Sequence, residues 1–185
     1  MADIKQELDR IKARISDANF LANKGLSNEV GIHVFTYAPQ YELIVRDYIE
    51  RLVKAPSDDF RIIERDMYKI LLEILEEKRV LGSVPSLEQK KGKDYLLAQL
   101  QKNATLGAFL AKMKYEPHKR GDVLFLTGVG KVYPFMRSHK MLDSMQQAFS
   151  DIPIVMFYPG EFNGQGLILF DKFHDGNYYR AFNLL

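Results

Sequence analysis

The chain contains no cysteine among its 185 residues. Disulfide bonds, CxxC zinc sites and catalysis by a thiol are therefore excluded. Long apolar runs are missing too, because no segment approaches the roughly 20 apolar residues that a membrane-spanning helix needs. The opening residues, MADIKQELDR, are charged from the third position onward and lack the apolar core of a secretory signal. These absences predict a cytoplasmic protein.

The chain also has little net charge, because 26 lysines and arginines stand against 24 acids, which leaves +2. Such a balance gives no global attraction to nucleic acid or to anionic lipid. The charge is unevenly distributed, however, since residues 86–120 hold eight cations and three acids. This basic block is either a solvated helical face or a docking patch for an acidic partner or a phosphate backbone.

Hydrophobic residues make up 46% of the chain, which is enough for one sizeable core. We therefore expect a single α/β domain over residues 1–185, with an amino-terminal helix within 1–24 and a helical insert at 86–120. The first helix should be amphipathic, because apolar residues recur at every third or fourth position: Ile4, Leu8, Ile11 and Ile15.

Strand-like and helical patterns alternate along most of the chain. Short β-branched and aromatic runs predict strands at residues 31–37, 60–64, 122–127, 152–158 and 166–170. Helical patterns between them begin at residue 38 and occupy 67–81 and 138–149. The apolar face of the first of these helices is expected to consist of Tyr41, Ile44, Val45, Tyr48, Ile49 and Leu52. This alternation predicts a mainly parallel sheet covered on both faces, which is a three-layer sandwich of Rossmann-like or P-loop-like type.

The carboxyl-terminal part departs from this alternation. Residues 159–165 are too few for a helical crossover, so the strands before and after them should form an antiparallel hairpin at the sheet edge. Residues 178–185 are expected to add a last strand or a short helix.

The loop after the predicted strand at 122–127 reads TGVGKVYP. A Walker A phosphate loop has the pattern GxxxxGK[S/T]. Aligning Gly130 and Lys131 with its GK pair puts Phe125 at the first glycine position and Val132 at the position of the magnesium-binding hydroxyl, so two elements fail. The loop is either a glycine turn that lets the backbone leave the sheet or a surface that binds something other than a nucleotide. Its candidate binding residues are Gly128, Gly130 and Tyr133.

Arg137, Ser138 and His139 stand where the next predicted helix begins. The amino terminus of a helix favours anions and an arginine adds a bidentate donor, so an anion pocket with Arg137 and His139 is one interpretation. The other interpretation is that Arg137 forms a salt bridge with Glu161 or Asp66.

Asp66 and Glu161 follow predicted strands, in the position where ligand groups gather in open α/β sheets. Tyr158 opens the segment YPGE that ends in Glu161, and it completes the candidate binding residues. Two carboxylates could hold magnesium, but no spacing rule specifies such a site, and neither a metal nor another cofactor is expected. The histidines lack zinc spacing and no serine lies in a GxSxG elbow, so nucleophilic catalysis has no support.

The carboxyl-terminal segment is rich in aromatic side chains, and residues 177–182 read NYYRAF. This pattern indicates either the packing of an edge strand or an interface patch, because Tyr, Phe and Arg are enriched at protein contacts. It favours a binding module over an enzyme. The candidate interface residues are Phe162, Tyr178, Tyr179, Arg180 and Phe182.

Three segments together resemble the BrxB family of BREX bacteriophage-exclusion systems: FLTGVGKVYPFMRSH, IPIVMFYPGEFNGQGLILF and NYYRAFNLL. The specific match lies in the last third of the chain. The residues that carry it are Thr127, Gly128, Gly130, Tyr133, Pro134, Arg137, Ser138, His139, 157–161, Gly164, 169–170 and 177–182.

The resemblance implies a non-catalytic interaction or scaffold subunit of a phage-defence assembly. Such systems also carry an alkaline-phosphatase-like PglZ protein, a large ATPase and a DNA methyltransferase. The PglZ-type protein is the first partner that the resemblance suggests, followed by the other BREX subunits. The family supplies no catalytic residues that can be carried over to this chain.

Two other functions stay open from the residues alone. One is a nucleotide- or nucleic-acid-binding module that uses the strand-end loops and the basic block at 86–120. The other is a metal-dependent nuclease or phosphatase that uses Asp66 and Glu161.

Overall fold

The structure is a computed structural model that describes residues 3–23, 31–174 and 181–185. Its α-helices are α1 (Ile4–Ile15), α2 (Ala18–Leu21), α3 (Glu42–Lys54), α4 (Met67–Glu77), α5 (Val84–Lys91), α6 (Lys93–Asn103), α7 (Leu106–Met113), α8 (Val129–Val132) and α9 (Ser138–Ala148). Its strands are β1 (Ile32–Tyr37), β2 (Arg61–Asp66), β3 (Asp122–Thr127), β4 (Ile154–Phe162), β5 (Leu167–Leu169), β6 (Phe173–His174) and β7 (Phe182–Asn183).

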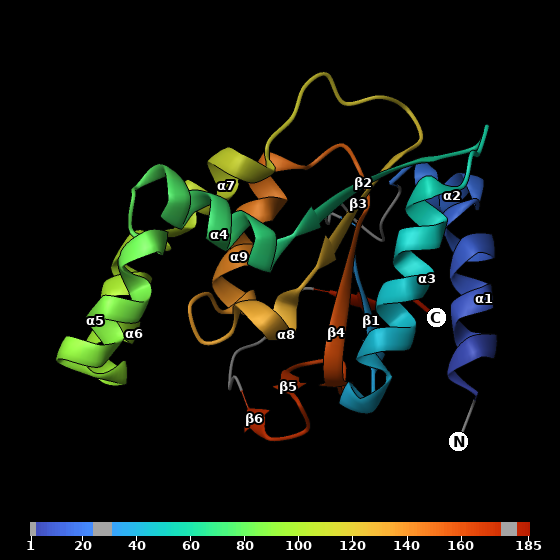
Figure 1. The fold of residues 1–185 in the computed structure, drawn as a ribbon. Coiled ribbons are helices and arrows are strands. Elements are labelled where there is room, and N and C mark those ends of the chain that lie inside the picture. The colour runs from blue at the N-terminus through green and yellow to red at the C-terminus, as the bar shows by residue number, and fades with distance from the viewer. Residues whose placement is uncertain (1–2, 24–30, 175–180) are drawn as a thin grey trace.

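The central sheet has the strand order β2-β3-β4-β1-β7, and every neighbouring pair along this path is parallel. Helices α1, α2 and α3 cover one face, while α4, α7, α8 and α9 lie on the other (Figure 1). The prediction of a three-layer α/β sandwich with a mainly parallel sheet is confirmed. Parallel strands need crossover connections, and the helices between the strands supply them.

Alternate residues of the central strands enter two separate hydrophobic clusters. Val123 and Phe125 of β3 pack with α1 and α3, whereas Leu124 and Leu126 pack with α4 and α9. Both sets are almost completely buried, since none of these four side chains is more than 1% exposed. A strand that is buried on both faces reads as a continuous apolar run, which explains the sequence VLFL.

Strands β4 and β5 form the expected antiparallel hairpin, with Glu161 opposite Ile168. The hairpin does not lie beside an outermost strand, because β4 is placed between β3 and β1 in the sheet. It extends instead from the carboxyl end of a central strand, beyond the edge where the parallel strands end (Figure 1). This position sets it directly against the loops that follow the neighbouring strands.

Gly160 allows β4 to approach β5 closely. Its φ is 151°, and a β-carbon there would lie 2.0 Å from the carbonyl oxygen of Ile168. Only glycine avoids that contact, so the YPGE segment is needed for the geometry of the hairpin.

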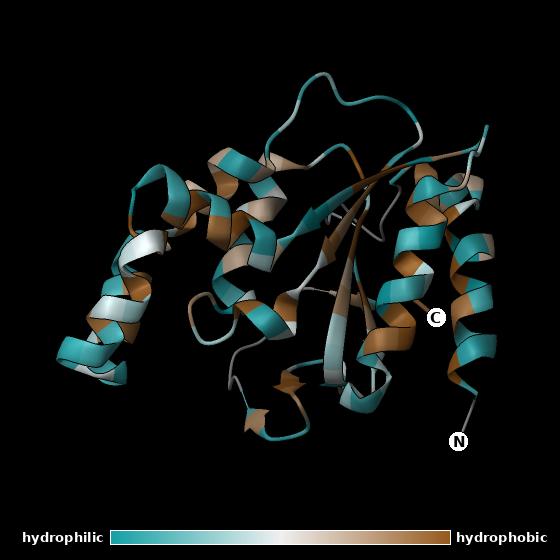
Figure 2. Cartoon of the chain, in the orientation of Figure 1, coloured by the Kyte–Doolittle hydropathy of each residue, from teal (hydrophilic) through white to brown (hydrophobic). Residues whose placement is uncertain are grey.

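The basic block at 86–120 contains most of α5, α6 and α7 and the connector to β3. Helices α5 and α6 project away from the sheet, and hydrophilic residues cover their far end (Figures 1 and 2). Lys90, Lys91 and Lys93 are exposed at the turn between the two helices. Among the described residues, no helix is both long and apolar enough to cross a membrane.

Three local predictions were wrong. The helix expected at 67–81 ends at Glu77, because Arg79 adopts a left-handed conformation with φ 57°. The glycine loop after β3 contains the one-turn helix α8. Ile44, which the helical pattern assigned to the apolar face of its helix, is 38% exposed.

Candidate functional site

The end of β2 and the turn after β3 meet at the carboxyl edge of the sheet. Asp66 ends β2 and caps α4, since one carboxylate oxygen accepts hydrogen bonds from the backbone N–H groups of Tyr68 (2.9 Å) and Lys69 (3.2 Å). Gly128 follows β3 with φ 69°, and a β-carbon there would lie 2.2 Å from the same carboxylate oxygen. The glycine turn is thus required both for the left-handed backbone and for the close approach of Asp66.

The lysine of the Walker-like segment has a partner within the protein. The Nζ atom of Lys131 lies 3.2 Å from the second carboxylate oxygen of Asp66, whose side chain is only 10% exposed. Beside this pair, the hydroxyl of Thr127 donates to Glu64 at 2.8 Å. Among the described residues no ion pair involves Arg137. The salt bridge of Arg137 with Asp66 or Glu161, which was one interpretation of the sequence, is therefore not formed. Asp66 uses its oxygens for the α4 cap and for Lys131.

A cavity of about 200 Å³ opens on the other side of α8. Three segments enclose it: α8 itself, the start of α9, and the β5–β6 hairpin. Its lining residues are Val129, Tyr133, Met136, Arg137, Ser138, Leu169, Lys172, Phe173 and His174. We call it the α8–α9 pocket.

Contacts between α8 and the hairpin hold the pocket walls together. The rings of Tyr133 and Phe173 lie 5.1 Å apart, and Phe173 meets Phe170 edge-on at 6.5 Å. Gly130 lets α8 approach this wall, since a β-carbon there would lie 2.8 Å from both Phe170 and Pro159. The two glycines of the TGVG turn therefore serve different purposes: Gly128 leaves room for the carboxylate of Asp66, and Gly130 leaves room for Phe170 and Pro159.

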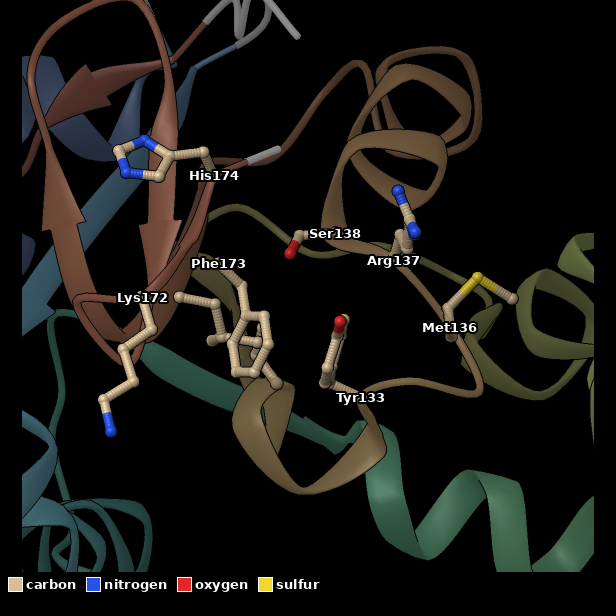
Figure 3. A pocket seen from close by; sticks show the side chains of 9 residues that line it. Tyr133, Met136, Arg137, Ser138, Lys172, Phe173 and His174 are labelled. Atoms are coloured by element: carbon tan, nitrogen blue, oxygen red, sulfur yellow. The ribbon is translucent and has the colours of Figure 1, made fainter. Parts of the chain in front are cut away.

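The pocket has an apolar floor and a polar rim. Val129, Met136 and Leu169 are buried, whereas Phe173 is 45% exposed at the mouth. In Figure 3 the hydroxyl groups of Tyr133 and Ser138 point toward the open centre. The mixture is typical of ligand pockets, which combine an apolar lining with a few placed polar groups.

Positive charge is not balanced around the pocket. Arg137 and Lys172 line it, and among the described residues no carboxylate does. The Nζ end of Lys172 extends away from the open centre in Figure 3. Arg137 is exposed at the start of α9, where no side chain caps the helix. The arrangement suits an anionic group better than a cation.

The structure brings together only part of the predicted binding set. Tyr133 and Arg137 line the pocket and Gly130 supports its wall. Tyr158 is 2% exposed within the core, and Glu161 is exposed on the hairpin without lining the pocket. His139 lies on α9, 3.6 Å from Asp143 one turn later.

The predicted partner-interface residues do not form one patch. Phe162 is partly buried against the cluster on the α4 and α9 face. Phe182 lies in β7 at the far edge of the sheet, 6.1 Å from the ring of His33. Tyr178, Tyr179 and Arg180 lie outside the described residues.

Sequence reasoning missed the hairpin side of the pocket, which consists of Leu169, Lys172, Phe173 and His174. The aromatic character of the carboxyl-terminal segment was the available signal, but it does not show which ring is exposed. Among the described residues, no group of three or more His, Asp or Glu side chains is placed to hold a metal ion.

Comparison with known proteins identifies the family. A family model described as "BREX protein BrxB" matches residues 63–184, from β2 to β7. The chain belongs to the BrxB family. The match includes every residue of the α8–α9 pocket, and it confirms the resemblance carried by the TGVG, YPGE and NYYRAF segments. Membership associates the chain with BREX phage defence.

Two relatives extend the similarity to the whole chain. A BREX protein BrxB of Bacillus cereus (strain H3081.97) is 42% identical over 190 residues, which cover 100% of this chain and 99% of the relative. A BREX protein BrxB of Escherichia coli O9:H4 (strain HS) is 31% identical over 185 residues, which cover 98% and 92%. No solved structure matches the chain significantly.

Proposed function

We propose that this protein is a non-catalytic interaction subunit of a BREX defence assembly and that it binds a PglZ-type partner. The binding surface is the mouth of the α8–α9 pocket at the carboxyl edge of the sheet. Family membership supports the BREX setting, and the exposed ring of Phe173 supports the mode of action.

Phe173 carries the proposal because it differs from the other phenylalanines. All 12 belong to the described part of the chain, and among them only Phe173 is exposed. Tyr133 and Phe170 hold its ring in place at the pocket mouth. An aromatic ring that is fixed before binding loses little conformational entropy on association, and such rings dominate the energetics of many interfaces.

The composition of the pocket favours binding over chemistry. A hydrolytic site needs a nucleophile within hydrogen-bond reach of a base. Within the described residues, no hydrogen bond joins Ser138 to His174, the histidine that also lines the pocket. The described residues of the cavity lining also contribute no carboxylate that would act as a general acid or base.

Size-exclusion chromatography with light scattering tests the proposal directly. The full chain is mixed with the PglZ-type protein of the same BREX system, at low and at physiological salt. We expect one co-eluting complex under both conditions, because apolar contacts at Phe173 are not screened by salt. Separate elution at both salt concentrations would refute the proposal.

A second candidate function is nucleic-acid binding through the far end of α5 and α6. Lys90, Lys91 and Lys93 are exposed there, and no ion pair involves them within the described residues. Tyr95 is 44% exposed beside them. Fluorescence anisotropy with a duplex DNA would show an affinity that falls steeply with salt if these lysines neutralise phosphates. An unchanged signal at low salt would remove this candidate.

A further inference from the structure

The geometry points to a carboxylate carried beside an apolar side chain, within a segment of the partner protein, as the group that the α8–α9 pocket recognises. This inference rests on the proposed function for the source of the segment. It specifies the chemistry of the contact, which family membership does not.

The size of the pocket limits its occupant. Its volume is about 200 Å³. Pockets for drug-sized ligands run from roughly 300 to 1,000 Å³. The α8–α9 pocket would therefore enclose only part of a nucleotide, whereas one side chain fits within it.

The apolar side of the pocket favours an apolar occupant. Val129, Met136 and Leu169 form the floor and are already no more than 6% exposed, whereas the ring of Phe173 at the mouth is 45% exposed. A purely ionic ligand such as a phosphate backbone would leave the ring of Phe173 in contact with water. An aromatic or aliphatic side chain would pack against this ring and gain burial energy.

The rim requires a negative charge. Arg137 lines the pocket and carries a planar group of donors that matches a carboxylate. The hydroxyls of Tyr133 and Ser138 point toward the open centre (Figure 3). Lys172 adds positive potential on the opposite rim rather than a direct contact, as the direction of its side chain indicates (Figure 3).

A second cleft on the other side of α8 shows the contrast. Its lining contains both cations and acids. The cations are Arg46, Lys54, Lys69 and Lys131, and the acids are Glu50, Glu64 and Asp66. There Lys131 is paired with Asp66 and Lys54 with Glu50. Charge in that cleft is largely compensated within the protein, whereas no acid of the described residues lines the α8–α9 pocket to compensate Arg137 and Lys172.

Blocked dipeptides serve as probes of this chemistry. The full-length, ¹⁵N-labelled protein is titrated with acetyl-Phe-Asp-amide, with acetyl-Phe-Asn-amide and with acetyl-Ala-Asp-amide, and amide shifts are followed by NMR. We expect the first peptide to shift the signals of Ser138 and Phe173 at millimolar concentration. The other two peptides should bind at least tenfold more weakly, since each lacks one half of the recognised group.

Two arginine variants isolate the charge. Arg137→Gln should weaken acetyl-Phe-Asp-amide at least tenfold, because the bidentate contact is lost. Arg10→Gln, at an exposed arginine of α1, is the matched control and should leave the titration unchanged. Equal affinity for the Asp and Asn peptides, or a titration that Arg137→Gln does not alter, would overturn the inference.

The inference and the proposed function fail in different ways. If the complex with the PglZ-type protein forms and keeps its affinity in Arg137→Gln, the carboxylate assignment is overturned while the interaction role stands. If the unaltered protein forms no complex, the interaction role is overturned whatever the peptides do.

Discussion

At the scale of single residues, Asp122 shows how a charge is kept inside this fold. Its side chain is buried at the start of β3 and accepts hydrogen bonds from Arg61 (two, both 2.7 Å), from the hydroxyl of Tyr115 (2.9 Å) and from the backbone N–H of Lys119 (2.9 Å). Burial opposes ionisation, but the hydrogen bonds led by Arg61 outweigh it, so the pKa of this carboxyl lies below its usual range.

Asp122→Asn should lower the free energy of unfolding by about 2–3 kcal/mol, because the charged hydrogen bonds are weakened and Arg61 loses its partner. Urea denaturation at pH 7 measures the change. Asp47→Asn is the control: Asp47 forms an exposed pair with Arg51, so its loss should cost less than about 1 kcal/mol. Equal effects of the two substitutions would contradict this account of Asp122.

The buried side chain of His33 should make the stability of the protein depend on pH. Burial, with a smaller contribution from the charge of Arg14, lowers the pKa of this imidazole from 6.5 to about 4. The unfolded chain therefore binds a proton below pH 6.5 that the folded chain does not bind. The contribution of His33 to the free energy of unfolding is therefore fully present above pH 6.5, and it is lost as the pH decreases toward 4.

We expect the unfolding free energy to fall by about 2 kcal/mol between pH 7 and pH 5 because of His33. His33→Phe keeps an aromatic ring beside Phe20 and Phe182 and should remove that part of the pH dependence. His174→Gln, at an exposed position, should not. Parallel pH profiles for the unaltered protein and His33→Phe would show that the pKa of His33 is not lowered.

At the scale of elements, the β4–β5 hairpin positions β5, which together with β6 forms one wall of the α8–α9 pocket. Gly160→Ala should destabilise the protein by about 2–4 kcal/mol, because the new methyl group meets the carbonyl oxygen of Ile168 and β5 must move. The same change at Gly107 of α7 meets nothing within 4 Å and should stabilise the protein by about 0.5–1 kcal/mol. Thermal unfolding of both variants checks this opposite sign, and a shift of the same sign would refute it.

Helices and strands can be predicted from the sequence where the apolar periodicity is strong. The prediction fails where tertiary contacts decide the local structure. The apolar spacing of α1 and the buried runs of β3 and β4 are visible in the chain, and so is the hairpin, because a short connection excludes a crossover. Helix α8 was not predicted, since a single turn with a glycine inside it has no periodic signal. Ile44 has the spacing of a buried residue, but α3 packs through Val45, Ile49 and Leu52 instead.

At the scale of the whole molecule, the candidate site joins segments that are far apart in the sequence. Asp66 and Gly128 lie close together because each stands at the carboxyl end of one of two neighbouring parallel strands. The sequence does predict this proximity. The α8–α9 pocket depends on the hairpin folding back from a central strand onto α8. No local sequence pattern predicts that tertiary contact. The sequence therefore shows that Phe173 is aromatic but not that its ring is exposed.

The family match and the pocket lead to one central claim, which is that the mouth of the α8–α9 pocket binds a partner through Phe173. The most direct measurement is the dissociation constant of the complex with the PglZ-type protein for two variants. Phe173 and Tyr95 are matched, since they are aromatic and 45% and 44% exposed on different parts of the molecule. We predict that Phe173→Ala weakens the complex roughly 30-fold, or about 2 kcal/mol, while Tyr95→Ala changes it less than about threefold. Equal affinities for the two variants, with melting temperatures unchanged, would contradict the account.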